Sequence, residues 1–199
     1  MDKKHQILWE RAWDVLPEAE LYLEEPSVQD VMQGQIGNCW LKAAIASLAE
    51  NPQAVIDLYV NTGNMQSEVG MYGVNLFVLG HPMTILVDDY LPVIRTEAGL
   101  LWLGRAITGK LTDEKKTIFS KARDKGSLWV LILEKVFAKR YGNYQHLESG
   151  DPADGMRALT GGPNRYVAHK NSGINKIWNL LKKHTVSDYI QVHTKGNDD

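Results

Sequence analysis

The feature that most constrains the fold of this 199-residue chain is an apolar helix that begins at its single cysteine. Between Cys39 and Ala49, four apolar residues recur at the spacing of one helix face: Leu41, Ala44, Ile45 and Leu48. Asn51-Pro52 marks the end of this helix, and Gly34 and Gly37 before it allow a tight loop. The pattern predicts a helix buried along one face, with Cys39 in its first turn.

The chain needs an ordinary hydrophobic core, because one cysteine cannot form an internal disulfide. Hydrophobic residues make up 44% and charged residues 23%, as in a typical globular protein. A net charge of −2 does not favour nucleic acid or an anionic membrane as the main partner. The longest apolar run, 128–133, is too short to span a bilayer, and the N-terminus lacks a signal-peptide pattern. We therefore expect an intracellular, cytoplasmic protein.

Hydrophobic periodicity predicts a helix-rich α+β domain with a small antiparallel sheet. Helices are expected at 7–16, 39–49, 52–59, 128–141, 152–159 and 174–184. Strands are expected at 71–79 and 83–87, joined by a tight connection at Gly80-His81-Pro82 and ended by residues 88–92. The polar and basic residues 108–126 indicate an exposed helical insertion or a loop.

Cys39 is the candidate nucleophile. In the first turn of a helix, unpaired N–H groups and the positive end of the helix dipole favour a thiolate, which is the competent nucleophile. Gln33 and the backbone N–H of Cys39 would form a two-donor oxyanion hole, and Trp40 would shield the nucleophile from water. A lone cysteine at a helix start is more commonly a small buried residue. The hypothesis therefore depends on Gln, two Gly, Cys and Trp occurring together.

This segment resembles the active-site segment of calpains, which reads Gln-Gly-x-x-Gly-Asp-Cys-Trp-Leu followed by an Ala-Ala-Ile-Ala-Ser-Leu helix. The matching residues here are 33–41 and 43–48. Two further stretches are similar to calpains in the same order. They are Val-Asp-Asp-Tyr-Leu-Pro at 87–92 and a run that extends from Leu128-Trp129 through Leu133-Glu134-Lys135 to Thr160-Gly161-Gly162. The resemblance covers roughly residues 21–181.

The resemblance implies a papain-like cysteine protease fold, with this chain as the helix-rich first subdomain of the calpain core. Residues 1–20 would be an N-terminal helical extension and 21–199 the cysteine-bearing subdomain, the second subdomain being absent from the chain. The implied activity is that of a calcium-regulated intracellular cysteine endopeptidase that forms a thioester acyl-enzyme. Its partners would be protein substrates or other proteins, with a second protease subdomain supplied in cis or in trans.

The family's triad histidine and asparagine belong to the second subdomain, in Gly-His-Ala-Tyr-like and Asn-Pro-Trp-Gly-like strings that do not occur in this sequence. His169 follows Cys39 at a papain-like spacing and precedes Asn171, but Thr160-Gly161-Gly162 aligns this region with the end of the first subdomain. His184 and His193 are weaker candidates for the base. Without a base, the chain alone is expected to be inactive.

The resemblance also implies a calcium site, although no cofactor is certain from the sequence. Carbonyl ligands would fall at Leu23 and Glu25, and one carboxylate ligand matches Asp30. The second carboxylate position is Ser127, which offers only a hydroxyl, with Asp124 nearby as a substitute. The alternative is that Asp30 only caps the segment before the nucleophile.

Two further departures flank the nucleophile. Asn38 stands where the family has aspartate, which removes a negative charge beside the thiol. Lys42 replaces an apolar residue and is expected to be exposed or to meet a partner surface. Together with Ser127 and the missing triad strings, Lys42 favours the alternative function of a catalytically silent scaffold or interaction module. Asp88-Asp89 is expected to cap a turn, and Glu134 to pair with neighbours of Lys135 or to bind across to the sheet.

Overall fold

The computed structural model describes residues 7–32, 34, 37–60, 63, 66–97, 113–117, 126–168, 170, 172–184 and 188–191. Its elements are, in chain order, β1 (Ile7–Arg11), α1 (Ala12–Val15), the 3₁₀ helix η1 (Val28–Asp30), α2 (Cys39–Leu48), α3 (Pro52–Ile56), β2 (Met71–Val78), β3 (His81–Asp88), β4 (Tyr90–Glu97), β5 (Asp113–Thr117), α5 (Trp129–Tyr141), the 3₁₀ helix η2 (Gln145–Leu147), α6 (Pro152–Thr160) and α7 (Ile174–His184). The predicted α+β class is confirmed.

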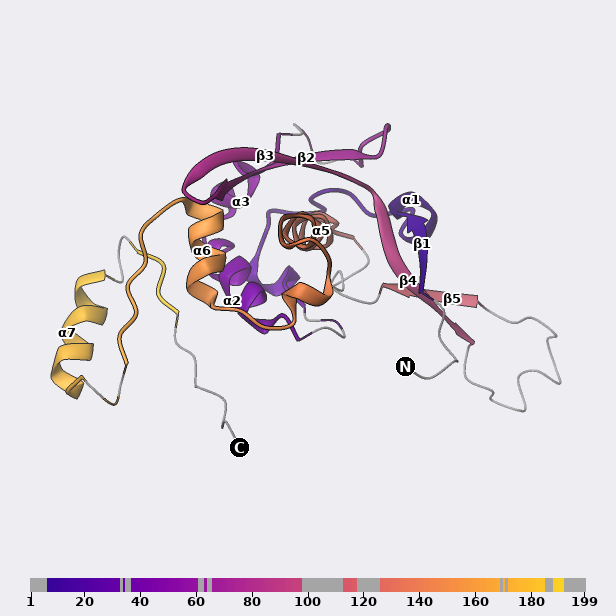
Figure 1. Ribbon diagram of the computed structural model, residues 1–199. Coiled ribbons are helices and arrows are strands. Elements are labelled where there is room, and N and C mark those ends of the chain that lie inside the picture. Colours follow the sequence, from indigo (N-terminus) through magenta and orange to yellow (C-terminus); the bar gives the residue numbers. More distant parts are fainter. Residues whose placement is uncertain are drawn as a thin grey trace.

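Helix α5 is the centre of the fold. Its sequence is apolar around most of its circumference, as expected of a helix that is covered on several sides. Figure 1 shows α5 end-on beneath the arch of β2 and β3, with α2 and α6 to one side and β1 and β4 to the other. Trp129 and Phe137 are both fully buried, and they are among the largest side chains of the core.

Helices α2 and α6 lie against each other on one side of α5. The contact depends on Gly155 of α6, because a Cβ atom there would lie only 2.7 Å from the Cβ of Ala44 in α2. Asp151 caps the start of α6 by accepting a hydrogen bond from the amide of Ala153 at 2.8 Å. The absence of a side chain at Gly155 therefore sets how closely the cysteine-bearing helix packs.

Strands β2 and β3 form an antiparallel hairpin, with Met71 opposite Asp88 and Val78 opposite His81. The turn consists of Leu79 and Gly80, whose φ angles are 51° and 84°. Positive φ at both positions is the signature of a type I′ turn, which matches the twist of a hairpin. The hairpin was predicted, but its turn was predicted at Gly80-His81-Pro82. The turn lies at Leu79 and Gly80 instead, and His81 and Pro82 belong to β3.

A second antiparallel sheet has the strand order β1-β4-β5. The helix predicted over 7–16 is wrong for its first part, because Ile7–Arg11 pairs with β4 and only Ala12–Val15 is helical. Periodicity cannot separate helix from strand in so short a segment. The chain also continues as β4 after Asp89, where the sequence predicted the end of a strand. Within 108–126, Asp113–Thr117 forms β5 rather than a helix or loop.

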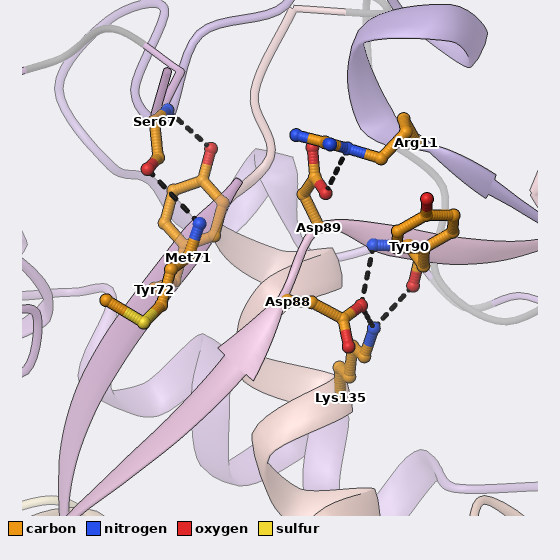
Figure 2. A network of polar contacts seen from close by, with 8 residues as sticks. All are labelled: Arg11, Ser67, Met71, Tyr72, Asp88, Asp89, Tyr90 and Lys135. Atoms are coloured by element: carbon orange, nitrogen blue, oxygen red, sulfur yellow. Dashed lines mark hydrogen bonds and ion pairs between the residues drawn. The ribbon is translucent and has the colours of Figure 1, made fainter. Parts of the chain in front are cut away.

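Polar contacts hold the corner between β3 and β4 (Figure 2). The carboxylate of Asp88 accepts hydrogen bonds from the amide of Tyr90 at 2.8 Å and from Lys135 of α5 at 2.5 Å. The neighbouring Asp89 is buried and forms an ion pair with Arg11 of β1 at 2.6 Å. The predicted capping role is confirmed for Asp88, whereas Asp89, between β3 and β4, binds β1 through Arg11.

Helix α7 stands apart from the rest of the fold (Figure 1), and none of its residues is buried. After it, Gln191 donates a hydrogen bond to the hydroxyl of Ser47 in α2 at 3.0 Å. Among the helices that the structure describes, none has both the length and the apolar character needed to cross a bilayer.

The hairpin turn leads to a prediction about stability. Leu79 has a left-handed backbone conformation, which is unfavourable for a branched side chain, and its side chain is 92% exposed. Leu79→Asn should raise the free energy of unfolding by about 1 kcal/mol, because asparagine tolerates this conformation, and the melting temperature by about 3 °C. Leu79→Ala is the control, since it removes the same exposed side chain but keeps the backbone penalty. Equal stabilisation by both variants would contradict the explanation.

Candidate active site

Cys39 is the first residue of α2, and its side chain is exposed. The predicted position in the first turn of a helix is therefore confirmed. The buried face of α2 fixes the helix in the core through Leu41 and Ile45, both fully buried. The loop before it passes close to the segment after η2, because a Cβ atom at Gly37 would lie 3.3 Å from the carbonyl oxygen of Glu148. The thiol is thus presented to solvent from a rigidly held helix.

The N-terminus of α2 is not capped by the side chain of its N-cap residue. Asn38 occupies the N-cap position, and its carbonyl oxygen accepts hydrogen bonds from the amides of Leu41 at 3.0 Å and Lys42 at 3.1 Å. Its side chain makes no capping hydrogen bond. The two preceding amides, those of Cys39 and Trp40, have no acceptor four residues back within the helix, and the first turn carries the positive end of the helix dipole. An anion at the Cys39 end of α2 is therefore electrostatically favoured.

Trp40 anchors the helix and does not cover the thiol. Its indole N–H donates to the carbonyl oxygen of Leu147 at 2.8 Å, and its ring makes an edge-on contact with Tyr141 at 5.9 Å. A Cβ atom at Gly150 would lie 2.5 Å from the ring, so this glycine leaves room for the indole. The expected shielding of Cys39 by Trp40 is wrong, because Trp40 points into the core while Cys39 is exposed.

Next to Cys39, the buried side chains of Asn38, Lys42 and Glu134 form a polar cluster between α2 and α5. Glu134 of α5 accepts a hydrogen bond from the side-chain amide of Asn38 at 2.6 Å, and the ammonium group of Lys42 lies 3.1 Å from the same Oε1 atom. Asn38 is fully buried, and Lys42 and Glu134 are only 6% and 2% exposed. Burial lowers the pKa of Lys42, and the negative charge of Glu134 opposes that shift.

The prediction that Lys42 is exposed or meets a partner is wrong, and Glu134 has a structural role, as predicted, with Asn38 and Lys42 among its partners. Lys42 and Glu134 are paired with each other across the interface of α2 and α5. A signal for this contact was present in the sequence. Asn38 and Lys42 are four residues apart, so they lie on one face of the helix, and both depart from the family pattern.

The structure does not test the other candidate catalytic residues. Those outside the described residues are Gln33, His169, Asn171 and His193. His184 is described, and it ends α7, where its Nδ1 atom contacts the carboxylate of Asp188. The roles of Gln33 and of any histidine therefore stay predictions.

The residues predicted to bind calcium do lie together. A cavity of about 70 Å³ beside η1 is lined by Leu23, Glu24, Glu25, Ser27, Asp30, Gly126 and Ser127. The Asp30 carboxylate accepts hydrogen bonds from the amide of Ser27 at 2.9 Å and from the indole of Trp129 at 3.1 Å. The hydroxyl of Ser127 accepts a hydrogen bond from the amide of Leu23 at 3.2 Å.

These contacts do not fit a tight calcium site. Calcium prefers six to eight oxygen ligands with several carboxylates. Among the described residues, no three His, Cys, Asp or Glu side chains are grouped so that they could hold a metal ion. One oxygen of Asp30 and the hydroxyl of Ser127 already serve as acceptors within the protein. Asp124 lies outside the described residues. The capping role proposed for Asp30 is confirmed by its hydrogen bond to Ser27.

Calcium at 0.1 mM should therefore leave the melting temperature of this chain essentially unchanged. Loss of a charged ligand moves affinity toward the millimolar end of the usual range of about 10⁻⁹ to 10⁻³ M. Below its dissociation constant, a ligand stabilises the folded state by less than about 0.4 kcal/mol. Ser127→Glu should produce a calcium-dependent rise of about 3 °C, and the neutral Ser127→Gln should not. Saturable micromolar binding by the unaltered chain that Asp30→Asn abolishes would contradict this prediction.

Comparison with known proteins identifies the family. The family model described as calpain family cysteine protease matches residues 1–197. A calpain from Schistosoma mansoni is 29% identical over 163 residues, which are 81% of this chain and 19% of that protein. Mouse calpain-5 is 29% identical over 163 residues, 78% of this chain and 22% of the relative. The human calpain-1 catalytic subunit is 27% identical over 161 residues, which are 80% of this chain and 20% of that protein. The chain thus spans about a fifth of the length of these relatives, and it belongs to the calpain family of cysteine proteases.

Proposed function

We propose that this calpain-family domain supplies the nucleophile of an intracellular cysteine endopeptidase. The observation that carries the proposal is the exposed thiol of Cys39 on the first residue of α2, at a helix end that the side chain of its N-cap residue, Asn38, does not cap. This arrangement combines access for a substrate with a field that favours an anionic sulfur. Protein substrates are proposed because the family consists of proteases.

In this proposal the thiolate of Cys39 attacks the carbonyl carbon of a peptide bond. The carbonyl oxygen becomes an oxyanion, which the backbone N–H of Cys39 and the side-chain amide of Gln33 stabilise. The C–N bond then breaks, the leaving amine takes a proton, and a thioester between Cys39 and the acyl group remains. Water hydrolyses the thioester and releases the carboxylic acid.

The proton transfers require a base that this sequence does not supply in the family's form. The calpain-type histidine and asparagine strings do not occur in it. We therefore place the base and its orienting amide on a second subdomain that joins this one in cis or in trans. Residues 21–199 would form the nucleophile-bearing subdomain, with 1–20 as an extension. Because β1 pairs with β4, that extension would contribute a strand to the subdomain's own sheet.

A catalytically silent scaffold is the second candidate function. One observation favours it: Ser127 uses its hydroxyl to bind the amide of Leu23, at the position where the family resemblance implies a calcium-binding carboxylate. A calpain-fold module that has lost its calcium response would retain the core and dock to other proteins. The two functions differ in whether Cys39 is reactive.

The reactivity of Cys39 separates these functions. At pH 7, iodoacetamide should alkylate Cys39 in the folded chain about fivefold faster than in the chain unfolded by guanidinium, because a helix N-terminus stabilises an anion by up to about 1 kcal/mol. Glutathione measured in both solvents corrects for the effect of the denaturant. A folded chain that reacts more slowly than the unfolded chain would favour the scaffold.

The purified chain should not cleave casein, with or without calcium. The proposed base lies on another subdomain, and acyl transfer needs a proton shuttle as well as a nucleophile. Product release can be followed by gel electrophoresis or fluorescence. Turnover that disappears in both Cys39→Ser and His169→Ala, but persists in His184→Ala, would show that His169 is the base and that the proposed division of the triad is wrong.

A further inference from the structure

We infer that Glu134 is a positioning residue for the nucleophile: it holds the side chain of Asn38 away from the N-terminus of α2, so that the amide oxygen of Asn38 does not compete for the first-turn N–H groups with an anion at Cys39. The inference rests on the proposed function, because it explains how the helix end beside Cys39 is kept available.

Asn38 would otherwise be expected to cap the helix. Asparagine is among the most favourable N-cap residues, because its side-chain oxygen accepts hydrogen bonds from the second or third amide of the helix. Asn38 is at that position, yet its side chain makes no such bond. Its Nδ2 atom instead donates to Glu134 of α5 at 2.6 Å. The acceptor on α5 thus holds this side chain, in a residue whose backbone (φ −102°, ψ 34°) also differs from the extended conformation of a typical N-cap residue.

The orientation leaves an unfavourable group behind. The Oδ1 atom of Asn38 is buried and has no hydrogen-bond partner within the described part of the chain. A buried acceptor without a partner is destabilising. The hydrogen bond to the Glu134 carboxylate is charge-assisted, and such bonds are shorter and stronger than neutral ones. This bond offsets part of the cost of the unpaired oxygen and the lost cap.

Lys42 offsets part of the cost of burying the Glu134 carboxylate. Its ammonium group lies 3.1 Å from the same Oε1 atom that accepts from Asn38. Asn38 and Lys42 are one helical turn apart, so both reach Glu134 from one face of α2. The two departures from the family pattern beside the nucleophile therefore meet at a single carboxylate oxygen. Lys42 provides the opposite charge, and Asn38 provides the hydrogen bond.

This arrangement favours reactivity over helix stability. A side-chain acceptor at the N-cap would satisfy one of the first amides and stabilise α2. It would also compete with a thiolate or an oxyanion for those amides and for the positive end of the dipole. By withdrawing the competing oxygen, Glu134 acts on Cys39 through Asn38 without touching the substrate.

The test replaces the buried charges together, because removing one partner leaves the other charge uncompensated. The double variant Lys42→Met with Glu134→Met deletes the acceptor for Asn38. Its matched control, Lys42→Met with Glu134→Gln, removes the same charges but keeps an amide oxygen that Asn38 can bind. The triple variant adds Asn38→Ala to the Met–Met pair and so removes the side chain that would cap α2. The readout is the rate of Cys39 alkylation by iodoacetamide at pH 7, in chains whose cooperative unfolding shows that they are folded.

The Met–Met variant should react about fivefold more slowly than the unaltered chain, the factor that a typical N-cap hydrogen bond contributes to an equilibrium. The Gln control and the triple variant should each react within about twofold of the unaltered chain. Recovery on deleting Asn38 is a result that a purely structural role of Glu134 does not produce.

Three outcomes would overturn the inference or its basis. A Met–Met variant that reacts as fast as the unaltered chain, or a triple variant that stays slow, would show that Asn38 is not the competitor that Glu134 restrains. A Gln control as slow as the Met–Met variant would show that charge, rather than the orientation of Asn38, is responsible. If the unaltered folded chain already reacts no faster than the unfolded one, the proposed nucleophile itself fails, whatever the variants do.

Discussion

Helix α5 is buried on most sides, and several other elements of the fold pack or hydrogen-bond to it. Its apolar side chains pack in the main core, and its few polar groups connect it to other elements. The carbonyl oxygen of Trp129 accepts a hydrogen bond from the hydroxyl of Tyr59 at 2.5 Å. The indole N–H of Trp129 donates a hydrogen bond to the carboxylate of Asp30. Lys135 binds the corner of β3 and β4, and Glu134 binds α2. One buried helix therefore positions the hairpin, the cavity beside η1 and the nucleophile helix.

The connection between α5 and α2 joins stability to reactivity. A buried ion pair is usually weak support for stability, because desolvation offsets most of the attraction between the charges. The pair between Lys42 and Glu134 lies behind the exposed Cys39, at the N-terminus of the same helix. An apolar contact at this place would hold α2 equally well. The polar contact also fixes the orientation of the Asn38 side chain. In the proposed function, this orientation keeps the side-chain oxygen of Asn38 from competing with an anion at Cys39.

The cavity beside η1 brings together the residues at the implied calcium-ligand positions, but one of them, Ser127, is not a carboxylate. The residues that the family resemblance assigns to calcium line one cavity, so the backbone arrangement is present. Ser127, however, is part of a parallel β-bridge with Glu20, and its hydroxyl is bound to Leu23. A hydrogen bond within the protein thus links the two segments at the position where the family resemblance implies a ligand to a cation. This is consistent with a domain whose fold does not depend on calcium.

Local patterns in the sequence were enough to predict the helices that begin at Cys39, Trp129, Pro152 and Ile174, the β2–β3 hairpin and the calpain resemblance. These features depend on residues near one another in the chain, where periodicity and motif spacing are informative. Strands β1, β4 and β5 were missed because a short strand is defined by a partner that lies far away in the sequence.

Sequence distance between partners also explains which features of the candidate active site could be predicted and which could not. From its local pattern alone, Cys39 could be predicted to begin a helix after a glycine-containing loop, and the structure confirms that it begins a helix. The tertiary structure was needed to show that Trp40 is an anchor, that Lys42 is buried, and that the side chain of Asn38 does not cap the helix. Each of these depends on an atom of α5 or of the segment after it, about a hundred residues further along the chain. Whether a polar side chain is exposed or buried is decided by the partner that folding brings to it, because only a partner can compensate the loss of water.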